Sequence, residues 1–235
     1  MDMAKNTTAI IVAGGKGLRM GNAVPKQFLP LAGKPILYYG VQKFMEVFPS
    51  IKIILVLPQA HISHANTLLQ ALAQHPHITI VHGGETRFHS VQNGLAQVAD
   101  DDIVFIHDGV RPFISEDLLL RCYRDTLAHG DAIPAIKVTD STRRWNGTYF
   151  EPIDRELLRS VQTPQTFLAA NIKKAYSLPY SESFTDEASV WEAYGFTVHL
   201  TEGDKDNIKI TTPEDMAMAE VLLQQLKPTN SVIQP

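Results

Sequence analysis

The chain has 235 residues, of which 44% are hydrophobic and 20% charged, an ordinary globular composition for one large domain or two small ones. The formal net charge of −4 argues against a nucleic-acid-binding protein, which would depend on many phosphate contacts. The one cysteine, Cys122, excludes a disulfide framework and a cysteine-based zinc site. No apolar run approaches the ~20 residues of a membrane span, and Met1–Thr8 lacks the apolar core of a signal peptide. We therefore expect a cytoplasmic protein without membrane contact.

Short apolar runs alternate with amphipathic segments from residue 9 to residue 138. Predicted strands occupy residues 9–13, 51–57, 78–81, 103–106 and 132–138. Predicted helices occupy residues 35–48, 59–74 and 90–98, and a further helix begins at Ser115. This alternation predicts a Rossmann-like, doubly wound and mostly parallel α/β sheet with right-handed crossovers.

The alternation breaks between Asp140 and Pro164, where the sequence is polar and Asn146-Gly147 signals a turn. We predict a β-arm over residues of about 139–158 that leaves the single domain, residues 1–235, and returns to it. An isolated hairpin is marginal in water, so the arm is expected to pack on something, such as a second subunit. Beyond the arm, the pattern predicts helices at 168–176 and 186–194, strands at 196–200 and 207–210, and a last helix from Thr212 to Leu226. Residues 227–235 are expected to form a frayed tail.

The loop after the first predicted strand is the most informative stretch. Glycines at positions 14, 15 and 17 let the backbone approach a ligand and expose its N–H groups, while Arg19 and Lys26 add two cations. Amides and cations at the end of a strand suit a polyphosphate. The glycine spacing misses the dinucleotide fingerprint by one residue, and prolines follow where that fingerprint needs a helix. We predict a loop that wraps a nucleoside triphosphate; a plain βα turn would leave both cations unexplained.

Two other motifs also follow predicted strands. Gly83-Gly84-Glu85 comes after the strand at 78–81, and His107-Asp108-Gly109 comes after the strand at 103–106. In doubly wound sheets, ligands bind outside the carboxyl ends of the strands. The three loops are therefore predicted to converge on one cleft.

Six stretches, in order along the chain, resemble nucleotidyltransferases that join CTP to a sugar or polyol phosphate. They are Gly14–Met20 with Pro25–Phe28, Gly83–Arg87 with Ser90, His107–Pro112, Thr163–Phe167, Thr185–Ser189, and Asp206–Thr211 with Pro213–Asp215. The first and fourth stretches also resemble ribitol-5-phosphate cytidylyltransferases. Thr185–Ser189 and Asp206–Lys209 favour the branch whose acceptor is 2-C-methyl-D-erythritol 4-phosphate. A non-catalytic nucleotide-binding regulator and, more distantly, a dehydrogenase remain alternatives.

The resemblance implies a nucleotide-diphospho-sugar transferase type of fold and a role for each matching residue. The implied nucleotide-binding residues are Ala13, Gly14, Gly15, Gly17, Gly84, Glu85, Ser90 and Asp108. The implied catalytic residues are Arg19, Lys26, Lys209 and Arg155. The implied cofactor is Mg²⁺ or another divalent cation, with Asp108 as a candidate ligand. A plain cap or turn role for Asp108, and a helix N-terminal role for Ser90, are the structural alternatives.

The implied acceptor-binding residues are Arg111, Ser141, Arg155, Thr163 and Thr185. The family commonly has Thr at the position of Ser141, which keeps the hydroxyl. By the same resemblance, the arm reaches across a homodimer and donates Arg155 to the partner's site. A salt bridge within the loop is the alternative for Arg111, and a local ion pair with Asp154 is the alternative for Arg155.

Overall fold

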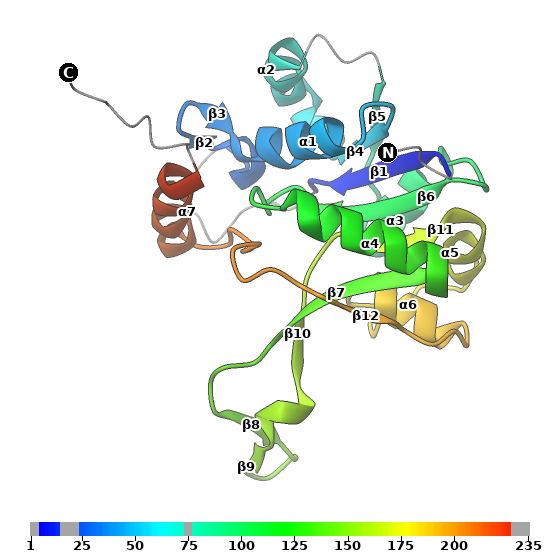
Figure 1. The fold of residues 1–235 in the computed structure, drawn as a ribbon, viewed down its shortest axis with the longest axis vertical. Coiled ribbons are helices and arrows are strands. Elements are labelled where there is room, and N and C mark those ends of the chain that lie inside the picture. Colours follow the sequence, from blue (N-terminus) through cyan, green and yellow to red (C-terminus); the bar gives the residue numbers. More distant parts are fainter. Residues whose placement is uncertain (1–4, 15–23, 73–76, 227–235) are drawn as a thin grey trace, which may run out of the picture.

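The computed structural model describes residues 5–14, 24–72 and 77–226, and its centre is one twisted sheet with helices on both faces (Figure 1). The strand order is β10-β7-β11-β6-β1-β4-β5, with β12 beside β7. The strands are β1 (Thr7–Val12), β4 (Lys52–Leu57), β5 (Ile78–His82), β6 (Ile103–Asp108), β7 (Asp131–Lys137), β10 (Arg159–Val161), β11 (Gln165–Leu168) and β12 (Leu200–Glu202). β1, β4, β5 and β6 pair in parallel, whereas β11 runs antiparallel between β6 and β7. The predicted mostly parallel sheet is confirmed.

Two layers of apolar side chains hold the helices to the sheet. The helices are α1 (Ile36–Val47), α2 (Ile62–Ala71), α3 (Arg87–Leu95), α4 (Glu116–His129), α5 (Ala169–Ala175), α6 (Glu187–Ala193) and α7 (Pro213–Leu226). Successive strand residues point to opposite faces. Ile11 packs in the cluster that holds α1, α2 and α4, and its neighbour Ile10 packs in the cluster that holds α3, α5 and α6. Strands β1, β4 and β6 are therefore buried on both faces, which explains their continuous apolar sequences, whereas the edge strand β5 is partly exposed.

Short side chains fix where the helices begin. The Ser115 hydroxyl accepts a hydrogen bond from the Leu118 N–H (3.0 Å), and Asp186 and Ser189 form a capping box at the start of α6. The predicted start of α3 at Ser90 is wrong. Thr86 caps this helix by accepting from the His89 N–H (3.3 Å), so Ser90 lies inside its first turns.

Several predictions beyond residue 160 are also corrected by the structure. β10 and β11 were not expected, because Pro164 and the polar residues around it conceal a strand pattern. No strand covers 207–210, and the strand predicted at 196–200 is the shorter β12, which begins at Leu200. Phe196 packs on the Trp191 ring (4.1 Å between centroids), so its apolar character serves helix packing instead. Part of the helix predicted at 59–74 and the tail at 227–235 lie outside the described residues.

The predicted β-arm is confirmed. β8 (Thr142–Trp145) and β9 (Phe150–Ile153) form an antiparallel pair that extends away from the sheet (Figure 1). At its tip, Gly147 has φ +99°, a left-handed conformation that glycine adopts without strain. A two-residue pair, β2 (Pro30–Leu31) and β3 (Lys34–Pro35), packs near α7 at the other edge of the molecule. No helix in the described ranges is long and apolar enough to cross a bilayer.

Candidate active site

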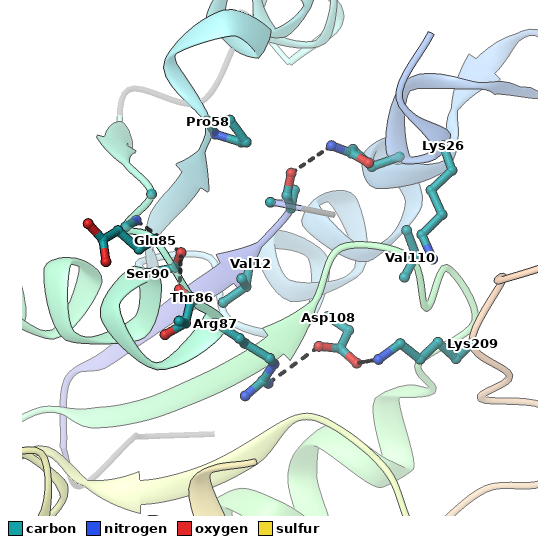
Figure 2. Close-up of a pocket in the computed structure, with 15 residues that line it drawn as sticks. Val12, Lys26, Pro58, Glu85, Thr86, Arg87, Ser90, Asp108, Val110 and Lys209 are labelled. Carbon is teal, nitrogen blue, oxygen red and sulfur yellow. Dashed lines mark hydrogen bonds and ion pairs between the residues drawn. The ribbon is translucent and has the colours of Figure 1, made fainter. Parts of the chain in front are cut away.

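A cleft with a volume of about 280 Å³ opens at the carboxyl ends of β1, β4, β5 and β6 (Figure 2). It is lined by Val12, Ala13, Gly14, Lys26, Gln27, Pro58, Gly83, Gly84, Glu85, Thr86, Arg87, Ser90, Asp108, Val110 and Lys209. The convergence that the sequence predicted is thus confirmed for Gly14, Gly84 and Asp108. Gly15, Gly17 and Arg19 lie outside the described residues.

One wall of the cleft is the tight loop before α3. The Gly84 N–H donates to the Ser90 hydroxyl (3.1 Å), and that hydroxyl donates to the Thr86 carbonyl (2.9 Å). A Cβ on Gly84 would lie 2.4 Å from the Cβ of His89, so this position admits only glycine without a shift of the loop. Glu85 is exposed, and Figure 2 shows its carboxylate directed away from Asp108. The Ser90 hydroxyl therefore holds the loop in shape by bonding to the backbone of Gly84 and Thr86.

Asp108 stands at the centre of a cluster of cations. Its carboxylate lies 2.8 Å from Lys209 Nζ, 3.3 Å from an Arg87 guanidinium nitrogen and 3.8 Å from Arg111 Nε. Burial alone would raise the pKa of Asp108, but these three positive charges outweigh it and hold the pKa well below its usual range. The carboxylate stays ionised, and Arg111 does form the loop salt bridge that the sequence left as an alternative.

Buried hydrogen bonds fix the backbone of Asp108 from behind. Its N–H donates to the Thr163 hydroxyl (3.0 Å), which lies 3.0 Å from Nδ1 of the fully buried His107. The other ring nitrogen, Nε2, lies 3.1 Å from the Arg111 carbonyl, which can only accept, so Nε2 carries the proton and Thr163 donates to Nδ1. Burial lowers the pKa of His107 to about 4, in agreement with this neutral tautomer.

The two lysines of the cleft come from segments that side-chain amides hold in place. The side-chain amide of the fully buried Asn207 donates to the Thr163 carbonyl (2.8 Å), while the backbone carbonyl of Asn207 accepts from the Arg111 guanidinium (2.6 Å). This ties the segment that carries Lys209 to the end of β6. Gln27 donates to the Ala13 carbonyl (2.6 Å) and ties the 3₁₀ turn η2 (Lys26–Phe28) to the end of β1. Lys26 and Lys209 thus enter the same cleft from two fixed segments.

The predicted acceptor residues fall into two groups. Arg111 and Thr163 lie beside Asp108, whereas Ser141 and Arg155 lie on the exposed arm and Thr185 is exposed just before α6. Arg155 donates to the Thr139 carbonyl (2.6 Å), and Asp154 caps the N–H of Glu156. Within one chain, the arm residues are not part of the cleft.

Arg87 and Glu187 belong to the site, although the sequence analysis assigned them no role. Arg87 lines the cleft and makes a two-pronged ion pair with the buried Glu187, with one N–O distance of 3.0 Å. Each residue lies in a recognised motif, at the start of a helix. That position gives no sign that the two helices meet.

The donor set suits a divalent ion that arrives with its phosphate ligand. In the described ranges, no group of three or more His, Cys, Asp or Glu side chains is arranged to hold a metal. Asp108 supplies one carboxylate, and Lys209 lies 2.8 Å from one of its oxygens. Mg²⁺ commonly takes one or two carboxylates together with phosphate oxygens and water. The residues therefore fit Mg²⁺ as a companion of a triphosphate.

A doubly wound sheet with a cationic cleft at its strand ends has the architecture expected of an α/β nucleotidyltransferase, and the family match assigns the chain to that class. Residues 7–225 match the family described as 2-C-methyl-D-erythritol 4-phosphate cytidylyltransferase. The chain belongs to this family, as the resemblance predicted, and it is a cytidylyltransferase.

Individual relatives agree with this assignment along nearly the whole chain. The protein of that name from Bacteroides fragilis is 46% identical over 216 residues, which cover 92% of this chain and 99% of the relative. A 4-diphosphocytidyl-2C-methyl-D-erythritol synthase structure from Anaerococcus prevotii matches with a TM-score of 0.80 and 29% identity, over 94% of this chain and 96% of that one. The Francisella tularensis enzyme matches with a TM-score of 0.77 and 32% identity, over 92% and 99%. The predicted fold class is thus confirmed by solved structures.

Proposed function

We propose that this chain transfers CMP from CTP to 2-C-methyl-D-erythritol 4-phosphate in non-mevalonate isoprenoid biosynthesis. The products are 4-diphosphocytidyl-2-C-methyl-D-erythritol and pyrophosphate. The observation that carries the proposal is the cleft in which Lys26, Lys209 and the Asp108 cluster meet the glycine loops of a cytidylyltransferase family. In the cluster, three cations face two carboxylates, so the site favours an anionic ligand.

The reaction needs positioning and charge neutralisation rather than a covalent enzyme intermediate. A phosphate oxygen of the acceptor forms a bond to the α-phosphorus of CTP, and the bond from that phosphorus to the bridging oxygen breaks as pyrophosphate leaves. Nucleophile and electrophile are both anionic, so cations that face the α-phosphate lower the barrier. We assign that role to Lys26, Lys209 and Arg19. The phosphate is already an anionic nucleophile, and the buried, neutral His107 therefore orients the loop instead of acting as a base.

A divalent cation, Mg²⁺ in the first instance, completes the proposal. Asp108 is the residue of this chain that would contact it, and the triphosphate would supply most other ligands. When bound, the ion adds positive charge to the polyphosphate. Chelation with EDTA is expected to abolish turnover, and added Mg²⁺ to restore it; full turnover in EDTA would remove the metal from the account.

The arm supports a homodimer as part of the proposal. Within the described residues, its two strands form a separate two-stranded sheet, and the hairpin exposes Trp145 (54%), Phe150 (60%) and, in the turn, Tyr149 (60%). Exposed aromatic side chains on a two-stranded hairpin are typical of a contact surface. An isolated hairpin is only marginally stable in water, and a patch of exposed apolar side chains commonly marks a site of protein contact. A partner's arm would bring Arg155 and Ser141 to the acceptor end of the cleft. We place this enzyme in the cytoplasm, where CTP is available.

One assay tests the activity and separates its rivals. Pyrophosphate release is measured with CTP and methylerythritol phosphate, with CTP and ribitol 5-phosphate, and with CTP alone. We expect turnover with the first acceptor. Turnover with ribitol phosphate alone would assign the other branch, and CTP binding without any turnover would indicate a non-catalytic regulator.

The dimer has its own test. Chains carrying Arg155→Ala are mixed with chains carrying Lys26→Ala, after each variant has been shown to be inactive alone. Shared sites predict that some mixed dimers recover activity, because one of their two sites has both residues intact. An absence of recovery in mixed dimers would place Arg155 in its own chain's site. The double variant Trp145→Ser/Phe150→Ser is expected to elute as a monomer.

A further inference from the structure

We propose that Arg87 is a positioning residue, anchored by the buried Glu187, that holds the Asp108 carboxylate in its working orientation. This inference rests on the proposed function, since it assigns to Arg87 a role in the cytidylyl transfer. Neither residue is needed for any step described above.

The geometry of the pair is specific. Both terminal nitrogens of Arg87 donate to the Glu187 carboxylate, and one of them also lies 3.3 Å from Asp108 Oδ1. Glu187 has no exposed surface, and the Tyr176 hydroxyl lies 3.3 Å from one of its oxygens. A two-pronged pair to a carboxylate fixes the plane of a guanidinium. Arg87 therefore directs the second N–H of the shared terminal nitrogen toward Asp108 at a set angle (Figure 2).

Asp108 is held from both sides as a result. Arg87 contacts Oδ1 and Lys209 contacts Oδ2, so the two cations approach the carboxylate from opposite directions (Figure 2). If Lys209 turns toward a triphosphate, as its assigned role requires, Arg87 still contacts Oδ1 at 3.3 Å, while Arg111 Nε lies farther away, 3.8 Å from Oδ2. A lysine at position 87 would keep the charge but lose the fork.

The surroundings leave Arg87 little freedom. It is the first residue of α3, and Glu187 is the first residue of α6. The next residue, Phe88, stacks on Tyr176 (4.7 Å between centroids) and on Phe184 (5.6 Å), so both sides of the joint are packed. Arg87 thus joins the loop of Gly83–Thr86 to the segment that follows Thr185, and it contacts Asp108 as well.

A competing role is direct contact with substrate, because the Arg87 side chain is 30% exposed and lines the cleft. The two roles differ in how they depend on Asp108. A residue that acts only by orienting Asp108 loses its importance when that carboxylate is removed. A residue that contacts phosphate itself keeps its importance.

The test is a double-mutant cycle on kcat/KM, with single-turnover rates for the weak variants. Arg87→Gln is made in the natural chain and in Asp108→Asn. We expect a loss of about 10- to 100-fold in the natural chain and a loss of less than about 3-fold in the Asp108→Asn chain. Equal losses in both backgrounds would overturn the proposal. Arg87→Lys is expected to recover part of kcat, and a complete recovery would also overturn it, since the fork would then be unnecessary.

Two further variants separate an effect on folding stability from an effect on catalysis. Lys173→Gln is the matched control, because the Lys173 side chain is 28% exposed, close to the value for Arg87, and pairs with Asp100 (2.6 Å). Asp100 precedes the amino end of β6, so this ion pair lies at the opposite end of the strand from the cleft. We expect this variant to melt earlier with kcat unchanged, and Glu187→Gln to lose kcat at temperatures where it remains folded. Retention of full kcat by folded Glu187→Gln would refute the anchoring role. The natural chain is assayed first: no acceptor-dependent turnover there refutes the proposed function, whereas normal turnover with equal losses in the cycle refutes only the inference.

Discussion

Replacement of Thr163 by Val removes one hydroxyl and leaves the shape of the side chain nearly unchanged. Thr163 is 5% exposed, and its hydroxyl makes two buried contacts, one with the Asp108 N–H and one with His107 Nδ1. In Thr163→Val, both groups lose their partner in a space that water does not reach. The variant therefore tests whether this hydroxyl orders the site or binds the acceptor.

The expected magnitude follows from the two unsatisfied groups. A buried donor or acceptor left without a partner costs about 1–3 kcal/mol, so the two together are expected to lower the free energy of unfolding by about 2–6 kcal/mol. Thr163→Ser keeps the hydroxyl and loses one methyl group, which costs about 1 kcal/mol. Urea denaturation at pH 7 measures both variants against the natural chain.

The Ser variant is also the control for activity. If the hydroxyl orders Asp108, Thr163→Ser keeps kcat and Thr163→Val lowers it, with a smaller change in the KM for the acceptor. A Val variant as stable as the natural chain would refute the hydrogen-bond argument. A change confined to the acceptor KM would return Thr163 to the direct binding role that the family resemblance implied.

Three other variants follow from the same site. Gly84→Ala would place a Cβ 2.4 Å from the His89 Cβ. If the cost of overpacking, about 1–3 kcal/mol, falls on CTP binding, the KM for CTP is expected to rise by about 5- to 150-fold; an unchanged KM would contradict the tight loop. His107 has a pKa of about 4 in the fold against an ordinary 6.5. The unfolded chain therefore takes up the proton first, and stability is full above pH 6.5 and falls toward pH 4 by about 3 kcal/mol. Denaturation of His107→Gln is expected to lack this fall, and an unchanged pH dependence would contradict the neutral tautomer. Lys26→Ala is expected to lower the single-turnover rate by about 10²–10³; near-normal turnover would refute its role in charge neutralisation.

Local patterns predicted the core of the fold well, because each signal there has a local cause. The apolar run at Ile51–Leu57 is buried on both faces, and Ser115 and Thr212 act as caps through hydrogen bonds three residues away. Where the cause is distant, the prediction failed. β11 is a strand because it pairs with β6 on one side and β7 on the other, and the cap at Thr86 is hard to distinguish from the loop of Gly83–Glu85 that precedes it.

The residues of the candidate site likewise fall into those that local sequence patterns predicted and those that depend on distant contacts. Loops that follow strands of one parallel sheet must meet at one edge, and the structure places Gly14, Gly84 and Asp108 there. The pairing of Arg87 with Glu187 joins residues 100 positions apart, and no spacing rule connects the starts of two separate helices. Residues of the arm, Ser141 and Arg155, lie outside the cleft of their own chain, so their roles depend on an assembly that a single sequence does not describe.

The central claim is that the acceptor's phosphate is the nucleophile, so that its own phosphorus–oxygen bonds stay intact while the α-phosphorus of CTP loses pyrophosphate. Methylerythritol phosphate labelled with ¹⁸O at its three non-bridging phosphate oxygens tests this when both products are analysed by mass spectrometry. Direct attack predicts that all of the label appears in 4-diphosphocytidyl-2-C-methyl-D-erythritol and none in pyrophosphate. Label in the pyrophosphate would contradict the account.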